Sequence, residues 1–126
     1  MSSQQPAPVF LNLFRIRFPV AAVTSIAHRI SGVLLFLFFP LLAWLLDLSL
    51  QGPEGYTQAL ELLQPLWVRL GLALIAWSLL HHLLSGIRFL LIDIDVGVSL
   101  RTARRSAWAV NIIGVLLGLA CLGWLL

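Results

Sequence analysis

Three long apolar stretches constrain the fold of this chain more than any other feature of its sequence. Two of them, residues 30–46 and 106–126, contain no charged residue, and the third, residues 66–93, is an apolar helix-length segment with polar residues set into it. A helix of about 20 predominantly apolar residues spans the hydrocarbon core of a bilayer. Because 60% of the 126 residues are also hydrophobic, the sequence predicts an all-α membrane protein with three transmembrane helices and no room for a second domain.

A single membrane-anchor domain is therefore expected over residues 1–126. Its predicted segments are a cytoplasmic or interfacial stretch at 1–18 and spans at 19–50, 65–93 and 106–126. Pro40 is expected to kink the first span, because proline lacks a backbone N–H and crowds the preceding turn. The loop after this span is rich in glycine and acidic residues, and residues 57–63 could form a short interfacial helix there.

The arginines decide which side of the membrane each loop faces. The first loop and the start of the second span carry Asp47, Glu54 and Glu61 against Arg69. The N-terminal side and the second loop carry Asp93 and Asp95 against seven arginines: Arg15, Arg17, Arg29, Arg88, Arg101, Arg104 and Arg105. Basic residues accumulate on the cytoplasmic side of membrane proteins. We therefore expect a cytoplasmic N-terminus and a periplasmic C-terminus.

Two adjacent histidines, His81 and His82, lie in the second span, where burying a polar group is expensive. Neighbouring helical residues point about 100° apart, so the two rings face different surroundings. The face of His82 carries small and polar groups, as an interior face does: Gly71, Ile75, Ser78, Ser85, Gly86, Phe89 and Asp93. The face of His81 is bulkier and, apart from Ser85 and Arg88, more lipid-like: Leu74, Trp77, Leu84, Ser85, Arg88 and Ile92. His82 is therefore the better candidate for a ligand.

Gly86 lies one turn after His82 and leaves no side chain where a flat cofactor would lie against the helix. This spacing fits a haem bound by His82. The alternative is a hydrogen bond from His82 to a neighbouring helix, because intramembrane histidines are functional by default but are not specifically haem ligands.

The first span carries a polar cluster that is expected one or two turns nearer the cytoplasm than His82. Its stripe consists of Ser25, His28, Arg29, Gly32 and Phe36. A hydroxyl and a guanidinium at the interface could hydrogen-bond a quinone carbonyl, and Arg29 or His28 could hold a haem propionate. The alternative is an ordinary snorkelling Arg29 at a helix start, with Ser25 as a cap.

The chain lacks the residues for a metal or nucleophilic site of its own. Cys121 is its single cysteine, and there is no CxxC motif. Any redox chemistry would therefore need a bound cofactor or a partner. In the third span, Asn111 and the glycines Gly114, Gly118 and Gly123 mark a face that could pack closely on another helix.

Two motifs in the first two spans point to a family. Residues 25–32 read S-I-A-H-R-I-S-G, and residues 82–88 read H-L-L-S-G-I-R, followed by Asp93. These segments resemble the patterns S-x-x-H-R-x-[ST]-G and H-x-x-x-G-x-R-H of the cytochrome b subunit of bacterial succinate dehydrogenase. The three-span topology extends the resemblance to the whole chain.

The resemblance implies roles for individual residues. It implies that His82 is one axial ligand of a b-type haem and that a second small membrane subunit supplies the other. It also implies that Ser25 and Arg29 contact ubiquinone and that His28 and Arg29 lie near the haem propionates. Asp93 matches a family acid whose role is left open.

At the level of the complex, the resemblance implies a multi-pass anchor in the bacterial inner membrane, with membrane lipid but no nucleic acid among its partners. The anchor would dock a flavoprotein subunit and an iron-sulfur subunit, which oxidise succinate and pass electrons to ubiquinone. No succinate chemistry would take place on this chain.

Two departures from the family pattern stand out. Phe89 replaces the usual histidine, so any propionate or proton contact from that position is absent, and Ala7 precedes Pro8 where the family often has arginine. Two other functions stay open: the anchor of a quinol:fumarate reductase, and a non-redox helical assembly subunit in which the histidines are packing contacts.

Overall fold

The computed structural model describes residues 17–126, and the helices in this part of the chain are α1 (Val20–Ser49), α2 (Pro53–Leu62), α3 (Leu66–Asp93) and α4 (Leu100–Leu125). Three of them, α1, α3 and α4, are long and apolar enough to cross a membrane. The predicted all-α class with three candidate spans is confirmed. Most of the interfacial segment predicted at 1–18, together with Arg15 and the Ala7–Pro8 departure, lies outside the described residues.

Local sequence signals account for the helix boundaries. α1 begins directly after Pro19 and continues through Pro40 as one helix. α2 begins at Pro53, earlier than expected, because proline suits the first helical turn. α4 begins at Leu100 rather than at residue 106, since the Ser99 hydroxyl accepts a hydrogen bond from the backbone N–H of Thr102 at 3.4 Å.

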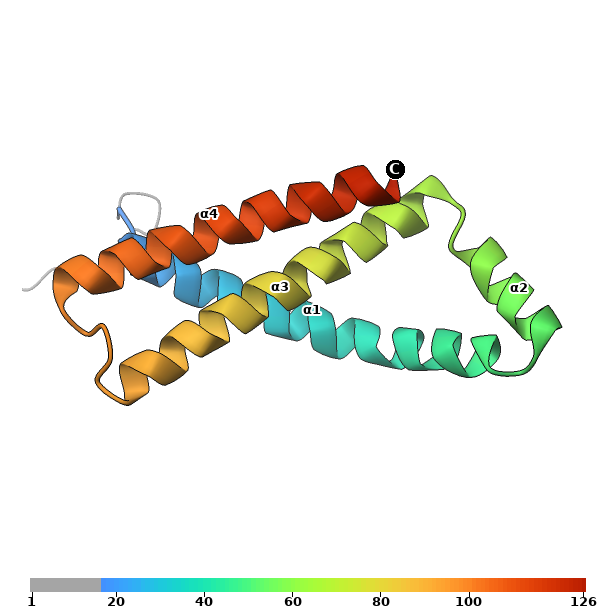
Figure 1. The fold of residues 1–126 in the computed structure, drawn as a ribbon, viewed down its shortest axis with the longest axis horizontal. Helices are drawn as coiled ribbons and strands as arrows, with labels where there is room; N and C mark the ends of the chain where they lie inside the picture. The colour runs from blue at the N-terminus through green and yellow to red at the C-terminus, as the bar shows by residue number, and fades with distance from the viewer. Residues whose placement is uncertain (1–16) are drawn as a thin grey trace, which may run out of the picture.

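The helix α3 lies in the middle of the bundle and packs against both α1 and α4 (Figure 1). Consecutive spans run in opposite directions, so the start of α1 and the α3–α4 connection lie at one end of the molecule, and α2 and the C-terminus at the other (Figure 1). α1 and α3 cross and then diverge toward the end that α2 closes (Figure 1). The crossing brings residues of the two motifs together.

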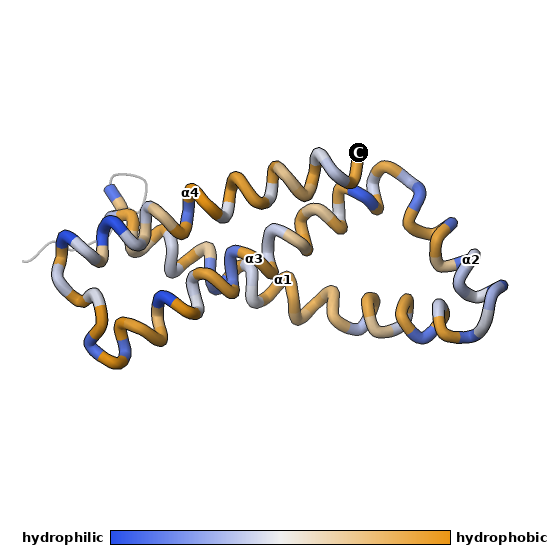
Figure 2. Tube along the Cα trace, in the orientation of Figure 1, coloured by the Kyte–Doolittle hydropathy of each residue, from blue (hydrophilic) through white to orange (hydrophobic). Residues whose placement is uncertain are grey.

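The distribution of side chains is the reverse of that in a water-soluble protein. The buried apolar residues are small, Ala59, Ala73, Ala107 and Val110, whereas large apolar residues cover the outside of α1, α3 and α4. The buried polar and charged side chains are Thr24, Ser31, Ser78, His81, Ser85 and Arg88. Hydrophilic stretches concentrate in the connections and recur on α3 near its crossing with α1 (Figure 2). Small and polar residues between helices are typical of membrane bundles.

Candidate functional site at the crossing of α1 and α3

His82 faces α1, and its hydrogen bonds determine which ring nitrogen carries the proton. Its Nδ1 lies 3.1 Å from the backbone carbonyl oxygen of His28 and 3.3 Å from the hydroxyl of Ser31. Because a carbonyl oxygen only accepts, Nδ1 is the protonated nitrogen and donates to it. The neutral ring then keeps a lone pair on Nε2, and such a nitrogen can bind a metal.

The close approach of His82 to α1 depends on Gly32. A Cβ atom at position 32 would lie 3.0 Å from Cε1 of His82, which is tighter than an ordinary contact. Ser31, the preceding residue, donates its hydroxyl to the same His28 carbonyl at 2.8 Å. Residues 28, 31 and 32 of the first motif therefore form the surface on which the His82 ring rests.

The ring of His28 stacks directly on the ring of His82. Their centroids are 4.0 Å apart with an interplanar angle of 14°, and Phe89 meets the His28 ring edge-on at 5.3 Å. The expectation that the cluster of α1 lies one or two turns nearer the cytoplasm is therefore wrong for His28, because α1 crosses α3 at the depth of His82. This crossing depth is a tertiary feature that the sequence alone does not contain.

The space over Gly86 is also filled differently from the expectation. The group nearest to a Cβ atom built at Gly86 is Nε2 of His28, at 3.7 Å. The glycine thus leaves room for the His28 imidazole on the neighbouring helix. The sequence correctly linked Gly86 to a group that lies close to the helix, but this group is the His28 side chain of α1.

The structure does not bring Ser25 and Arg29 to His82. Ser25 is half-buried and Arg29 is exposed, and within residues 17–126 neither side chain hydrogen-bonds to the histidine. The buried hydroxyls on α1 belong instead to Thr24 and Ser31, both with 0% exposure. Sequence reasoning missed Thr24, and Ser31 could have been found because it occupies the [ST] position of the first motif.

His81 is the clearest correction. The sequence indicated a more lipid-like face for it, yet only 2% of the residue is exposed. Its Nε2 lies 3.3 Å from Oδ1 of Asn111 on α4, and its Nδ1 lies 3.3 Å from the hydroxyl of Ser85. The bulky face is interior because α4 presents glycine to it: a Cβ atom at Gly114 would lie 3.0 Å from Cδ2 of His81.

Arg88 belongs to the same α4-facing side of α3. Its Nε donates to the hydroxyl of Ser106 at 3.0 Å, and its Nη2 donates to the carbonyl oxygen of Ala103 at 3.1 Å. The guanidinium carbon lies 5.3 Å from the centre of the Phe89 ring. These contacts hold the arginine in the α3–α4 interface, whereas Asp93, at the end of the second motif, is exposed.

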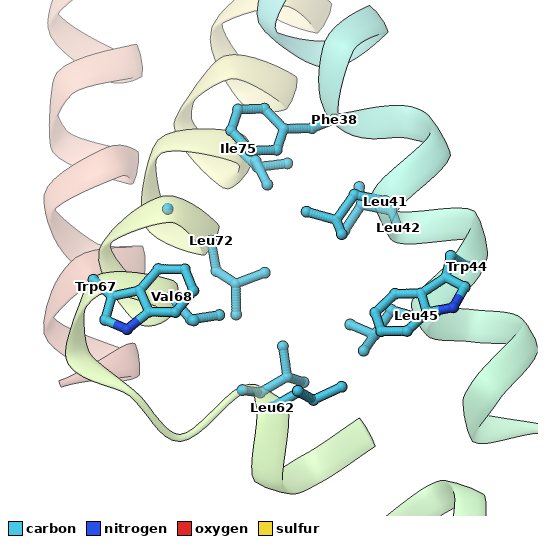
Figure 3. Close-up of a pocket in the computed structure, with 12 residues that line it drawn as sticks. Phe38, Leu41, Leu42, Trp44, Leu45, Leu62, Trp67, Val68, Leu72 and Ile75 are labelled. Atoms are coloured by element: carbon cyan, nitrogen blue, oxygen red, sulfur yellow. The ribbon is translucent and has the colours of Figure 1, made fainter. Parts of the chain in front are cut away.

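A cavity lies elsewhere, between α1, α2 and the first half of α3 (Figure 3). It has a volume of about 430 Å³. Apolar side chains from all three helices point into it, including Phe38, Leu42, Leu62 and Ile75 (Figure 3). Sites for polar ligands have a few converging polar groups in an apolar pocket, so this cavity does not suit the carbonyl groups of a quinone.

Residues 17–126 contain no group of three or more His, Cys, Asp or Glu side chains that could hold a metal ion. At the crossing, Nε2 of His82 is an imidazole nitrogen with a lone pair, in surroundings of stacked aromatic rings and buried hydroxyls. Such a nitrogen suits a cofactor that brings its own further ligands.

Comparison with known proteins shows which family this chain belongs to. Residues 3–121 match the sequence model of the succinate dehydrogenase/fumarate reductase transmembrane subunit. The chain belongs to this family. As a member of a transmembrane-subunit family with three membrane-spanning helices, it is a multi-pass membrane protein.

Relatives of this transmembrane subunit carry a more specific name. The succinate dehydrogenase cytochrome b556 subunit of Coxiella burnetii is 36% identical over 107 residues, which cover 84% of this chain and 86% of the relative. The subunit of the same name from Paracoccus denitrificans is 32% identical over 108 residues, covering 83% and 79%. That of Rickettsia felis is 29% identical over 115 residues, covering 91% and 88%. These similarities confirm the resemblance to the cytochrome b anchor subunit of succinate dehydrogenase.

Proposed function

We propose that this chain is the haem b-binding membrane anchor of a succinate dehydrogenase and forms part of its ubiquinone-reduction site. The relatives that are named cytochrome b556 subunits support this choice. The observation that carries the proposal is the contact of 3.1 Å between Nδ1 of His82 and the His28 carbonyl. Metal-binding histidines commonly donate their other ring N–H to a carbonyl, which fixes the tautomer and the orientation of the ring.

In this proposal, Nε2 of His82 binds the haem iron. His28 is not the second axial ligand, because its ring stacks on His82 at 4.0 Å and leaves no room for a porphyrin between the two. His81 does not serve either, since both of its ring nitrogens contact other side chains. The second ligand would come from a second small membrane subunit, as the family resemblance implies. When bound, the haem supplies reversible one-electron redox chemistry.

The two cationic or ionisable residues of the first motif would act on different groups. His28 lies beside His82 and Arg29 is exposed on the outside of α1, so both remain candidates to hold the haem propionates. Arg29 and Ser25 would also contact ubiquinone, Ser25 as a hydrogen-bond donor to a carbonyl. The guanidinium favours negative charge that develops on the quinone oxygen.

We propose a cytoplasmic N-terminus and an inner-membrane location. Among the described residues, Arg17, Arg29, Arg88, Arg101, Arg104 and Arg105 belong to the half of the molecule that holds the start of α1 and the α3–α4 connection. The opposite half carries Asp47, Glu54 and Glu61 against Arg69. This asymmetry supports the orientation expected from the positive-inside rule.

The proposed partners are the second membrane subunit, an iron-sulfur subunit and a flavoprotein subunit, with succinate oxidised on the flavoprotein. Electrons would reach ubiquinone at the cytoplasmic edge of the bilayer. The anchor of a quinol:fumarate reductase shares this architecture, and the family model covers both enzymes. The names of the relatives favour succinate dehydrogenase.

The test replaces the proposed ligand. In membranes that contain the whole complex, His82→Ala should abolish the reduced b-type haem spectrum, because it removes the imidazole nitrogen proposed to bind the iron. The control is Leu83→Ala at the next position, whose side chain is exposed and which should keep the spectrum. An unchanged reduced spectrum in His82→Ala would reject His82 as the ligand.

A further inference from the structure

Four polar side chains from three helices meet on the α4-facing side of α3, and the proposed function does not use them. They form a cluster, here named the buried junction, which consists of Thr24, His81, Ser85 and Asn111. Thr24 and Ser85 have 0% exposure and His81 has 2%. A buried polar group in a membrane protein is costly unless it is partnered, so the junction must contribute something that a simple apolar contact would not.

The contacts converge on one amide oxygen. Oδ1 of Asn111 on α4 lies 3.3 Å from Nε2 of His81 on α3 and 3.1 Å from the hydroxyl of Thr24 on α1. That hydroxyl shares its one proton between Asn111 and the Val20 carbonyl of its own helix, which is 3.0 Å away. Because an amide oxygen only accepts, His81 donates its Nε2–H, and its Nδ1 accepts from the hydroxyl of Ser85. The junction thus joins all three spans at one point.

This connection fixes the rotation of α3 about its own axis. Apolar side chains gain little by packing between helices rather than against lipid, so interhelical hydrogen bonds and close packing determine how membrane helices face one another. Adjacent residues of a helix point about 100° apart. The direction of the His81 ring toward α4 therefore also determines the direction of the His82 ring toward α1.

The two histidines carry their ring proton on different nitrogens, which agrees with His81 contacting α4 and His82 contacting α1. His81 is protonated on Nε2 and is held at both nitrogens, whereas His82 is protonated on Nδ1 and keeps its Nε2 lone pair. A rotation of α3 would lengthen the contact between Nδ1 of His82 and the carbonyl oxygen of His28. It would also move the His82 ring away from Gly32.

We propose that His81 and Asn111 are positioning residues for His82: the buried junction holds α3 in the rotation that keeps Nδ1–H of His82 on the His28 carbonyl and directs Nε2 at the haem iron. This inference rests on the proposed haem-binding function. It assigns the second histidine of the pair a role that is distinct from ligation.

The test compares substitutions that keep or remove the junction in the detergent-extracted whole complex. His81→Leu removes both polar contacts, whereas His81→Gln keeps a donor and an acceptor on a side chain of similar reach. The matched control is Ser106→Ala, which removes another α3–α4 hydrogen bond, that of Arg88. The readouts are the electron paramagnetic resonance g-values of the ferric haem and its midpoint potential.

His81→Leu should shift the g-values and raise the midpoint potential, because a weaker hydrogen bond from Nδ1 makes the imidazole a poorer donor to ferric iron. His81→Gln and Ser106→Ala should both stay near the unsubstituted protein. Equal values in His81→Leu and the unsubstituted protein, or a shift in Ser106→Ala as large as in His81→Leu, would overturn the inference.

A second variant keeps the test decisive if His81→Leu does not assemble. Thr24→Val is nearly isosteric and removes one arm of the junction, so a smaller shift of the same sign is expected, and no shift would count against the proposal. The His82→Ala experiment separates the two claims. If haem survives in His82→Ala, the proposed function fails; if haem is lost there but no junction variant changes its signals, only the positioning role fails.

Discussion

The two sides of α3 at residues 81 and 82 carry the same side chain in opposite situations. On the α4 side, the His81 ring is buried and both of its nitrogens have partners within this chain. On the α1 side, the hydrogen bonds of His82 within residues 17–126 are made by Nδ1, and the residue is half-buried. The comparison teaches that the neighbouring helix, rather than the residue type, decides whether a buried histidine is a structural tie or a candidate ligand.

The neighbouring helices differ in what they offer to the ring. Both present a glycine at close range, Gly114 to His81 and Gly32 to His82. α4 adds an amide side chain, Asn111, that pairs with the far nitrogen of its histidine, whereas α1 adds a backbone carbonyl that pairs with the near one. On the α1 side, the His82 ring is closely packed and its Nδ1 is hydrogen-bonded, whereas α1 offers no hydrogen-bond partner to its Nε2 among the described residues. This is the arrangement expected of a histidine that binds a cofactor through Nε2.

Of the substitutions that test the contrast between the α1 and α4 sides of α3, replacement of the exposed Arg29 on α1 is expected to have the largest effect on activity. Arg29→Ala should lower quinone reduction by about 10²-fold, the cost typical of removing one group that stabilises developing negative charge. Succinate oxidation by a soluble dye should stay near normal, because that reaction bypasses the quinone. The measurement is the ratio of the two rates in the whole complex.

The control for Arg29 is Arg69→Ala, which removes a base from the opposite half of the molecule, where it donates to Gln64 at 2.6 Å. It should leave the ratio of the two rates unchanged. If Arg29→Ala lowers both activities equally, Arg29 is a structural residue, and the idea that the α1 side of α3 serves quinone reduction is not supported.

A smaller effect is expected when the close approaches on the two sides are disturbed separately. Gly32→Ala places a Cβ atom 3.0 Å from Cε1 of His82, and Gly118→Ala places one 2.7 Å from Cδ1 of Trp77, on the α4 side. Overpacking costs roughly 1–3 kcal/mol, so both should lower the temperature at which the complex dissociates. Only Gly32→Ala should also change the haem absorption spectrum markedly.

Gly123→Ala provides the control for this pair, because a Cβ atom at that position meets nothing within 4 Å, and both properties should be unaffected. A spectrum that changes as much in Gly118→Ala as in Gly32→Ala would break the comparison, since it would mean that packing on the α4 side reaches the ligand as directly as packing on the α1 side.

The features that could be predicted from the sequence are those that depend on local composition or local motifs. Hydropathy alone identifies three spans, because a span needs only length and apolar composition. The ligand candidate His82 and its supporting Ser31 lie in local motifs. The sequence indicated a more lipid-like face for His81 because bulky residues such as Trp77 suit lipid unless the partner helix offers glycine, and here Gly118 does so.

The depth at which α1 crosses α3 was not predictable in the same way. His28 stacks on His82 because two helices from distant parts of the sequence meet at that level, and no local pattern specifies the crossing. On α1, Thr24 is buried and the neighbouring Ser25 is half-buried, because Thr24 faces α4, where its hydroxyl lies 3.1 Å from Oδ1 of Asn111. A one-residue difference of this kind is set by helix rotation, which in turn depends on contacts such as the buried junction.

The smallest expected effect comes from Ser31, the hydroxyl that shares the His28 carbonyl with His82. Ser31 donates to that oxygen at 2.8 Å, and Nδ1 of His82 approaches the same oxygen at 3.1 Å. Ser31→Ala should remove one of the donors that compete for this carbonyl, whose helical partner is the Gly32 N–H, and so strengthen the hydrogen bond from Nδ1. The haem midpoint potential should then fall slightly, opposite in sign to the rise expected when the buried junction is removed.

Ser78→Ala is the matched control, because Ser78 is equally buried on α3 but donates only to the Leu74 carbonyl of its own helix at 2.8 Å. Its potential should equal that of the unsubstituted protein in a redox titration of the whole complex. A rise in Ser31→Ala would mean that the hydroxyl supports the ring rather than competing with it. The α1 side would then depend on a side-chain partner just as the α4 side depends on Asn111, and the contrast between the two histidines would be one of degree.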